Sequence, residues 1–147
     1  MIGKVFKIGI TKIGSHNINK VDSVKAIKKT GLEGDRFFKI NNDKRSQLTI
    51  IEKEVIDNYN KFTNKGFPYE NFRRNIVSTN IKLNNLINKE VFVGDVKIKV
   101  HDFCEPCLHL QELLKEKNLV RSLLRKGGIR CEIMTSGIIK IGDNITL

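Results

Sequence analysis

The sequence predicts a mainly β protein: a closed or nearly closed barrel of about seven short strands with two or three inserted helices. Short apolar runs that alternate with polar residues recur along most of the chain, as half-buried strands require. Helical periodicity is confined to the stretches after residues 48 and 103, without the regular strand–helix alternation of a parallel sheet. Turn residues such as Gly-Asp separate the closing strands.

The clearest strands form a hairpin in which residues 90–93 and 96–100 flank Gly94-Asp95. Lys97 and Lys99 alternate there with apolar residues, so one face of this hairpin should be buried. The other expected strands are 4–11, 24–29, 45–51, 72–78, 129–134, 138–141 and 144–147. Because the last hairpin ends at Leu147, we expect one complete domain over residues 1–147.

The first expected helix begins near residue 50 and ends near residue 62. Thr49 and Glu52 have the spacing of a capping box, which makes Glu52 a helix cap rather than a catalytic acid. Whether residues 48–51 form a strand or the first helical turn stays open. The apolar residues expected on one helix face are Ile51, Val55, Tyr59 and Phe62.

The second helical stretch follows Phe103. Cys107 and three leucines after it share a face, and an amphipathic segment over 119–124 ends at Gly127-Gly128.

The composition predicts a globular protein with anionic partners. Hydrophobic residues make up 39% of the chain, and no apolar stretch is long enough for a membrane span or a signal peptide, so a cytoplasmic protein without membrane partners is expected. Twenty-seven Lys and Arg against sixteen Asp and Glu leave a net charge of +11, which favours a nucleic acid, an acidic protein or a phosphorylated cofactor. Nucleic acid is the least favoured, because the lysines are interspersed with apolar residues and Trp is absent.

Reactive side chains concentrate at residues 101–109, whose sequence is HDFCEPCLH. Proline favours the first helical position, so Pro106 would place Cys107 in the first turn of a helix. The unpaired N–H groups and the positive end of the helix dipole would stabilise a thiolate there. The three cysteines are expected as thiols, because their number is odd and the chain has no export signal.

Four interpretations of this segment compete. Both cysteines of the pair, Cys104 and Cys107, could fill gaps in the core, as Cys131 is expected to do from its apolar strand face. His101, Cys104, Cys107 and His109 could bind zinc, although such close spacing rarely closes one tetrahedral site. The pair could be a redox CxxC, but the thioredoxin-like frame is missing. Finally, Cys107 alone could bind a cofactor or carry sulfur to it.

Several motifs of the chain, taken in order, resemble the MOSC domain, the C-terminal module of molybdenum-cofactor sulfurases. The resemblance extends from about residue 3 to the end and implies a β-barrel of the pyruvate-kinase-barrel type. The matching motifs are GLEGDR at 31–36, QLTIIE at 47–52, FRRNI at 72–76, VGDV at 93–96, CEPCLHL at 104–110, RKGGIR at 125–130 and SGIIKIGD at 136–143.

The resemblance implies a molybdopterin-type ligand, with Cys107 as the central residue and Cys104 as a feature of a subgroup. Thiolate suits a soft molybdenum centre, so Cys107 is also the expected metal ligand. Phe37 stands where many members of the family have histidine.

The phosphate of molybdopterin calls for arginines, whose planar fork binds oxyanions. The candidates are Arg36, Arg74 and Arg130, the last because it alternates with apolar residues along its strand. Asn75 and Asp35 lie beside them in the sequence; a turn-capping role is favoured for Asp35.

The expected function is therefore molybdenum-cofactor binding or sulfur carriage through Cys107, as a persulfide, in cofactor sulfuration or delivery to a molybdoenzyme. The chain has no room for a pyridoxal-phosphate domain, so that cofactor would belong to a separate cysteine desulfurase. One alternative is a molybdenum-dependent reductase component that acts on N-hydroxylated compounds with a separate electron donor. Another is a basic binding domain without catalysis.

Overall fold

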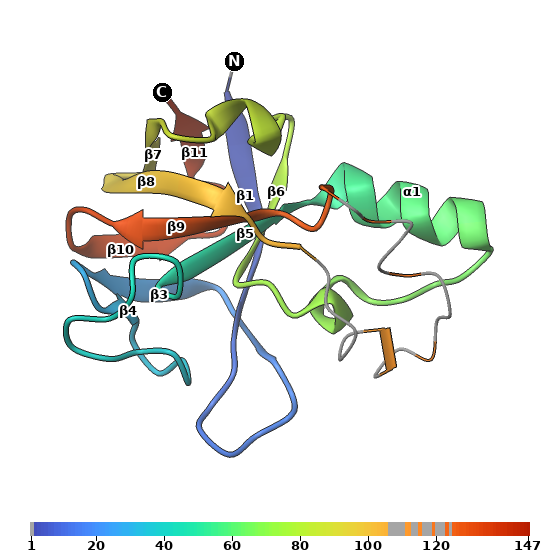
Figure 1. Cartoon of the computed structure of the whole chain (residues 1–147), viewed down its shortest axis with the longest axis horizontal. Helices are drawn as coiled ribbons and strands as arrows, with labels where there is room; N and C mark the ends of the chain where they lie inside the picture. The colour runs from blue at the N-terminus through green and yellow to red at the C-terminus, as the bar shows by residue number, and fades with distance from the viewer. Residues whose placement is uncertain (1, 106–110, 113–114, 116–118, 120–122, 124) are drawn as a thin grey trace.

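The computed structural model describes residues 2–105, 111–112, 115, 119, 123 and 125–147. In this part of the chain, strands form a closed barrel in the order β11-β7-β8-β9-β5-β6-β1, which the pairing of β1 with β11 completes (Figure 1). The mainly β barrel expected from the sequence is thus confirmed. Its strands are β1 (Gly3–Ile10), β5 (Leu48–Glu52), β6 (Ile76–Thr79), β7 (Glu90–Val93), β8 (Val96–Phe103), β9 (Ile129–Ile133) and β11 (Asn144–Thr146).

Four further strands lie outside this closed ring. β2 (Asn19–Val21) pairs with β1, and a second sheet has the order β10-β3-β4. Its strands are β10 (Gly137–Lys140), β3 (Ser23–Ile27) and β4 (Gly31–Leu32). β2 and β4 were not predicted from the sequence, because strands of three and two residues are too short to show an alternating pattern.

One α-helix, α1 (Lys53–Thr63), and two 3₁₀ helices, η1 (Tyr69–Phe72) and η2 (Leu83–Leu86), lie within the described residues. Residues 48–51 belong to strand β5 and not to the first helical turn. The capping box was wrong: Glu52 is the N-cap residue, but its Oε2 accepts a hydrogen bond from the Leu83 N–H instead of capping α1. The Thr49 hydroxyl is likewise engaged elsewhere, with Asn75.

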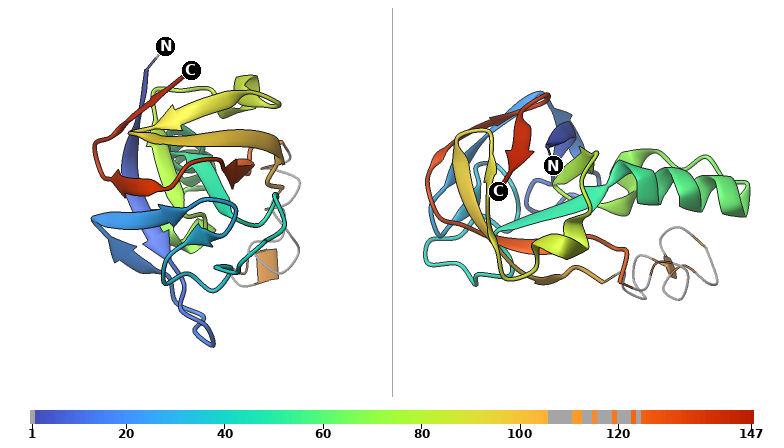
Figure 2. Two further views of the ribbon diagram at one scale, coloured as in Figure 1. Left: turned by 90° about the vertical axis from the view of Figure 1, so that its left-hand side faces the viewer. Right: turned by 90° about the horizontal axis from the view of Figure 1, so that it is seen from above.

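The apolar face expected for the helix is correct only in part. Tyr59 is buried and Val55 half-buried, as that face requires, whereas Ile56, outside the expected face, is buried too. Phe62 is 91% exposed, near the end of α1 that projects sideways from the barrel (Figure 2). None of the helices in the described residues is long and apolar enough to cross a membrane. The helical segments expected between residues 107 and 124 lie largely outside the described residues.

The strand expected at 72–78 begins only at Ile76. Residues 69–72 form η1, and Arg73 ends it with a left-handed backbone (φ 61°), which breaks the extended conformation. The strand expected at 45–51 likewise begins later, at Leu48.

The core has two parts. Apolar side chains of the strands, such as Val5, Ile50 and Ile98, fill the barrel. A second cluster, which includes Ile56 and Phe72, packs α1 and η1 against the outside of the barrel. This second cluster fixes the position of the chain that leads from η1 into β6, where several candidate site residues lie.

Candidate functional site

A cavity of about 250 Å³ lies where several strand ends meet. Segments from the end of β1, the turn after β4, the start of β6 and the end of β8 line it, together with side chains of β5 and β9. It brings together the residues proposed from the sequence for the molybdopterin site, apart from Cys107, which lies outside the described residues; His101 and Cys131 do not line it. The candidates that line the cavity are Asp35, Arg36, Arg74, Asn75, Cys104 and Arg130. The lining also includes Arg73, which the sequence analysis did not select.

Cations dominate the cavity wall. Four arginines line it, and Asp35 is the one carboxylate among the described lining residues. Asp35 is 6% exposed, and its carboxylate already accepts hydrogen bonds from the backbone N–H groups of Thr11 (2.8 Å) and Phe37 (3.4 Å). The turn-holding interpretation of Asp35 therefore agrees with its contacts. Because this carboxylate is engaged with the backbone, the cavity suits an incoming anion.

Arg36 and Arg73 carry like charges close to one another. Burial, and after it the positive charge of Arg36, lowers the pKa of Arg73. The Arg73 guanidinium donates one hydrogen bond, to the His16 carbonyl. The Arg36 guanidinium lies 4.8 Å from the centre of the Phe37 ring and forms no ion pair with a described residue. An anion held between these two arginines would offset their repulsion.

Arg74 differs from the other arginines because backbone carbonyls engage its whole guanidinium. Its Nε donates to Gly127 (2.9 Å), Nη1 to Phe72 (3.2 Å), and Nη2 to Cys104 (3.3 Å) and Glu105 (3.4 Å). The Cys104 N–H also donates to the Gly128 carbonyl, at 2.8 Å. Arg74 therefore joins the two ends of the segment that contains Cys107, and we assign it a structural role beside the cavity.

Replacing Arg74 with methionine should destabilise the protein, because four backbone carbonyls, three of them in partly buried hydrogen bonds, lose a charged donor. We expect the free energy of unfolding to fall by about 2 to 3 kcal/mol, measured by urea denaturation. Arg36→Met is the matched control: the Arg36 side chain donates no hydrogen bond to a described residue, so a change below about 0.5 kcal/mol is expected. Equal losses in the two variants would contradict the structural role of Arg74.

Asn75 also has a structural environment. Its Oδ1 accepts hydrogen bonds from the backbone N–H (3.1 Å) and hydroxyl (3.2 Å) of Thr49, and its Nδ2 donates to the Gly9 carbonyl (3.1 Å). Asn75 thus ties β1 to β5 at the cavity. Arg130 projects from the outer face of β9 and donates one hydrogen bond, from Nη1 to the Arg45 carbonyl. Its remaining N–H groups leave Arg130 able to bind an anion.

Two of the three thiols lie in the core. Cys104 is 3% exposed, and Cys131 is fully buried, as expected from its strand face. Burial, followed by the neighbouring Cys104, raises the pKa of the Cys131 thiol far above its usual range. Cys131 is therefore neutral at physiological pH and is a poor nucleophile.

The zinc interpretation gains no support from the described residues. His101 lies at a bulge of β8, and its Nε2 is 2.8 Å from Oε1 of Glu132, which orients the ring toward that carboxylate. No three His, Cys, Asp or Glu side chains gather as a metal site in the described ranges. His109 and Cys107 lie outside those ranges.

The fold and cavity define a small closed β-barrel with an arginine-lined cavity where strand ends meet. The chain belongs to the MOSC domain family, whose model matches residues 33–146, and it is thus a molybdenum-cofactor-related domain. No curated protein matches the sequence.

Among solved structures, the chain is similar to the YuaD protein of Bacillus subtilis (TM-score 0.85, 18% identity), with 99% of this chain and 94% of that chain covered. It is also similar to YiiM from Geobacillus stearothermophilus (TM-score 0.79, 16% identity, 99% and 74% covered). The chain is also similar to YiiM from Escherichia coli (TM-score 0.72, 17% identity), with 99% of this chain and 67% of that chain covered. At these identities the likeness shows the shared fold.

Proposed function

We propose that this protein binds the molybdenum cofactor, or receives sulfur destined for it, with the arginine cavity holding the phosphate and Cys107 supplying the thiol. The observation that carries the proposal is the cluster of Arg36, Arg73 and Arg130 on one cavity of a MOSC domain, each with N–H groups not engaged by described residues. Guanidinium groups are the side chains best suited to bidentate phosphate binding. When bound, the cofactor would supply a redox-active molybdenum centre.

We assign the thiol chemistry to Cys107 because the environments of Cys104 and Cys131 suit it less. Cys131 is buried in the barrel core and its pKa is raised, so it does not suit nucleophilic attack or sulfur exchange. Cys104 lines the arginine cavity but is only 3% exposed, which restricts the access of a partner's persulfide to its thiol. Sulfur would arrive as a persulfide on a cysteine desulfurase, which is the partner that carries pyridoxal phosphate. The Cys107 thiolate would attack the terminal sulfur; a new S–S bond would form on Cys107 while the partner's S–S bond breaks and its thiolate leaves.

The test is elemental and pterin analysis of protein purified anaerobically from a host that makes the cofactor, with persulfide measured by cyanolysis. We expect molybdenum and pterin, or persulfide sulfur, in the unaltered protein, and their loss in Cys107→Ser, because serine provides neither a soft ligand nor a sulfur acceptor. Cys131→Ala is the matched control and should retain them, since the Cys131 thiol is buried in the barrel core and does not line the arginine cavity.

Two results would contradict the proposal. Retention of molybdenum, pterin and persulfide in Cys107→Ser would remove the role of that thiol. Zinc in place of molybdenum would favour the histidine–cysteine metal site instead.

A further inference from the structure

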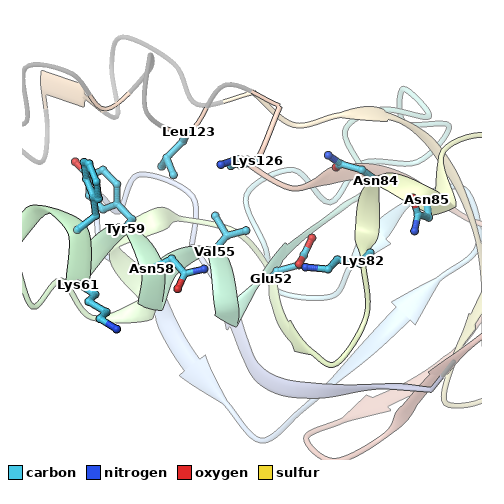
Figure 3. A pocket seen from close by; sticks show the side chains of 11 residues that line it. Glu52, Val55, Asn58, Tyr59, Lys61, Lys82, Asn84, Asn85, Leu123 and Lys126 are labelled. Carbon is cyan, nitrogen blue, oxygen red and sulfur yellow. The ribbon is translucent and has the colours of Figure 1, made fainter.

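A second hollow, of about 1060 Å³, lies between α1, η2, Leu123 and Lys126 (Figure 3). It shares no lining residue with the arginine cavity. We call it the α1 groove. Its size is close to that of small-molecule sites in proteins, which span roughly 300 to 1,000 Å³. It is not part of the proposed cofactor site, so its function is a separate question.

The α1 groove has an apolar end and a polar end. Tyr59 and Leu123 face one another toward the far end of α1, and Val55 continues the apolar wall. Tyr59 and Leu123 are 6% and 3% exposed and belong to the second core cluster, so this wall is fixed by packing. Exposed Phe62 extends the apolar wall at the rim. This end can therefore accept a hydrocarbon group.

The other end carries cations and amides. Figure 3 shows Lys82 and Glu52 side by side near Asn84 and Asn85, with Lys126 between them and Leu123. Lys126 and Lys82 form no ion pair within the described part of the chain, whereas Lys61 points away from both.

Glu52 is the one carboxylate among the described residues of the groove lining. Its Oε2 accepts a hydrogen bond from the Leu83 N–H. Burial raises the pKa of Glu52, while this hydrogen bond and the positive charge of Lys82 act in the opposite direction. Three lysines against this single carboxylate leave the groove with a net positive charge.

We propose that the α1 groove binds an amphipathic organic anion, a carboxylate with a hydrocarbon body. Lys82 and Lys126 hold the carboxylate, and the body lies along Val55, Tyr59 and Leu123. Lysines at one end and an apolar wall at the other match the two parts of such a ligand. The concave, small-molecule size of the groove favours this ligand over a polypeptide chain.

The test uses the full chain and three probes in isothermal titration calorimetry: dodecanoate, dodecanol and acetate, each below its aggregation limit. We expect one dodecanoate per chain, binding of dodecanol about tenfold weaker, and no measurable binding of acetate, because both parts of the ligand are required. Lys82→Gln and Lys126→Gln should each weaken dodecanoate binding about fivefold or more and leave dodecanol unchanged. Lys25→Gln is the matched control: Lys25 is exposed and lies outside the groove lining, so its loss should change the affinity by less than about twofold.

Several outcomes would overturn this inference. Failure of dodecanoate to bind would contradict the proposed ligand class. Binding of dodecanol with the same affinity as dodecanoate would remove the role of the lysines. Loss of dodecanoate binding in Arg36→Gln, but not in the Lys82 and Lys126 variants, would place the anion in the arginine cavity. Lysine-dependent binding of poly-L-glutamate without dodecanoate binding would assign the groove to an acidic polypeptide.

Discussion

Gly128→Ala is expected to lower the free energy of unfolding by about 4 kcal/mol, the largest stability effect of any single substitution proposed for this chain. Gly128 has φ 107°, a conformation that L side chains rarely adopt. An added Cβ would also lie 2.1 Å from the carbonyl oxygen of Ile50 in β5, a backbone atom of the barrel that cannot move without breaking strand pairing. Urea denaturation measures the loss.

The matched control is Gly142→Ala. Gly142 has a similar positive φ of 92°, but a Cβ there would meet no atom within 4 Å. We therefore expect a loss of only about 1 kcal/mol, the cost of the backbone conformation alone. The difference between the two variants measures the steric clash at Gly128. If both variants lose the same stability, the close approach of β5 to Gly128 is wrong.

Removing both charges of the Arg36–Arg73 pair is expected to weaken binding of a phosphate monoester about hundredfold. Each arginine contributes a charge-assisted hydrogen-bond donor to the cavity, so Arg36→Gln and Arg73→Gln singly should each cost about tenfold. The double variant combines the two losses. Phenyl phosphate is a suitable probe, and its dissociation constant is measured by calorimetry at constant ionic strength, because salt screens such contacts.

Arg125→Gln is the control for this measurement. Arg125 is exposed, its guanidinium lies 5.9 Å from the centre of the Phe103 ring, and it does not line the cavity. We expect its loss to change the affinity by less than about twofold. Binding that survives in the Arg36–Arg73 double variant would show that the phosphate lies elsewhere.

The strands most visible in the sequence were those whose partner is next in the chain. The hairpin of β7 and β8 has its alternating lysines and its Gly-Asp turn within a few residues, so the local pattern contained everything needed. The first turn of α1 was interpreted wrongly for the opposite reason. Thr49 and Glu52 have capping-box spacing, but their side chains bond to Asn75 and Leu83, which are 26 and 31 residues away.

The candidate site shows the same limit. The sequence indicated arginines, and the structure brings Arg36, Arg74 and Arg130 to one cavity. The sequence could not distinguish Arg73 from Arg74, because the two arginines are neighbours in the same motif. Arg74 is engaged by the carbonyls of Cys104 and Gly127, 30 and 53 residues along the chain, whereas Arg73 lines the cavity beside Arg36. In the sequence, the adjacent arginines of the FRRN motif pointed to both Arg73 and Arg74 equally as candidate cavity residues.

By itself, the sequence determined the mainly β class, the closing hairpins and the MOSC motifs, because alternation, turns and motifs are local properties of the chain. The tertiary structure alone decided that β1 closes the barrel on β11, which pairs residues near opposite ends of the chain. It also decided which arginine donors are already engaged by carbonyls and which line the cavity with donors to spare. Both depend on contacts between residues far apart in the sequence, whose partners no local pattern can specify.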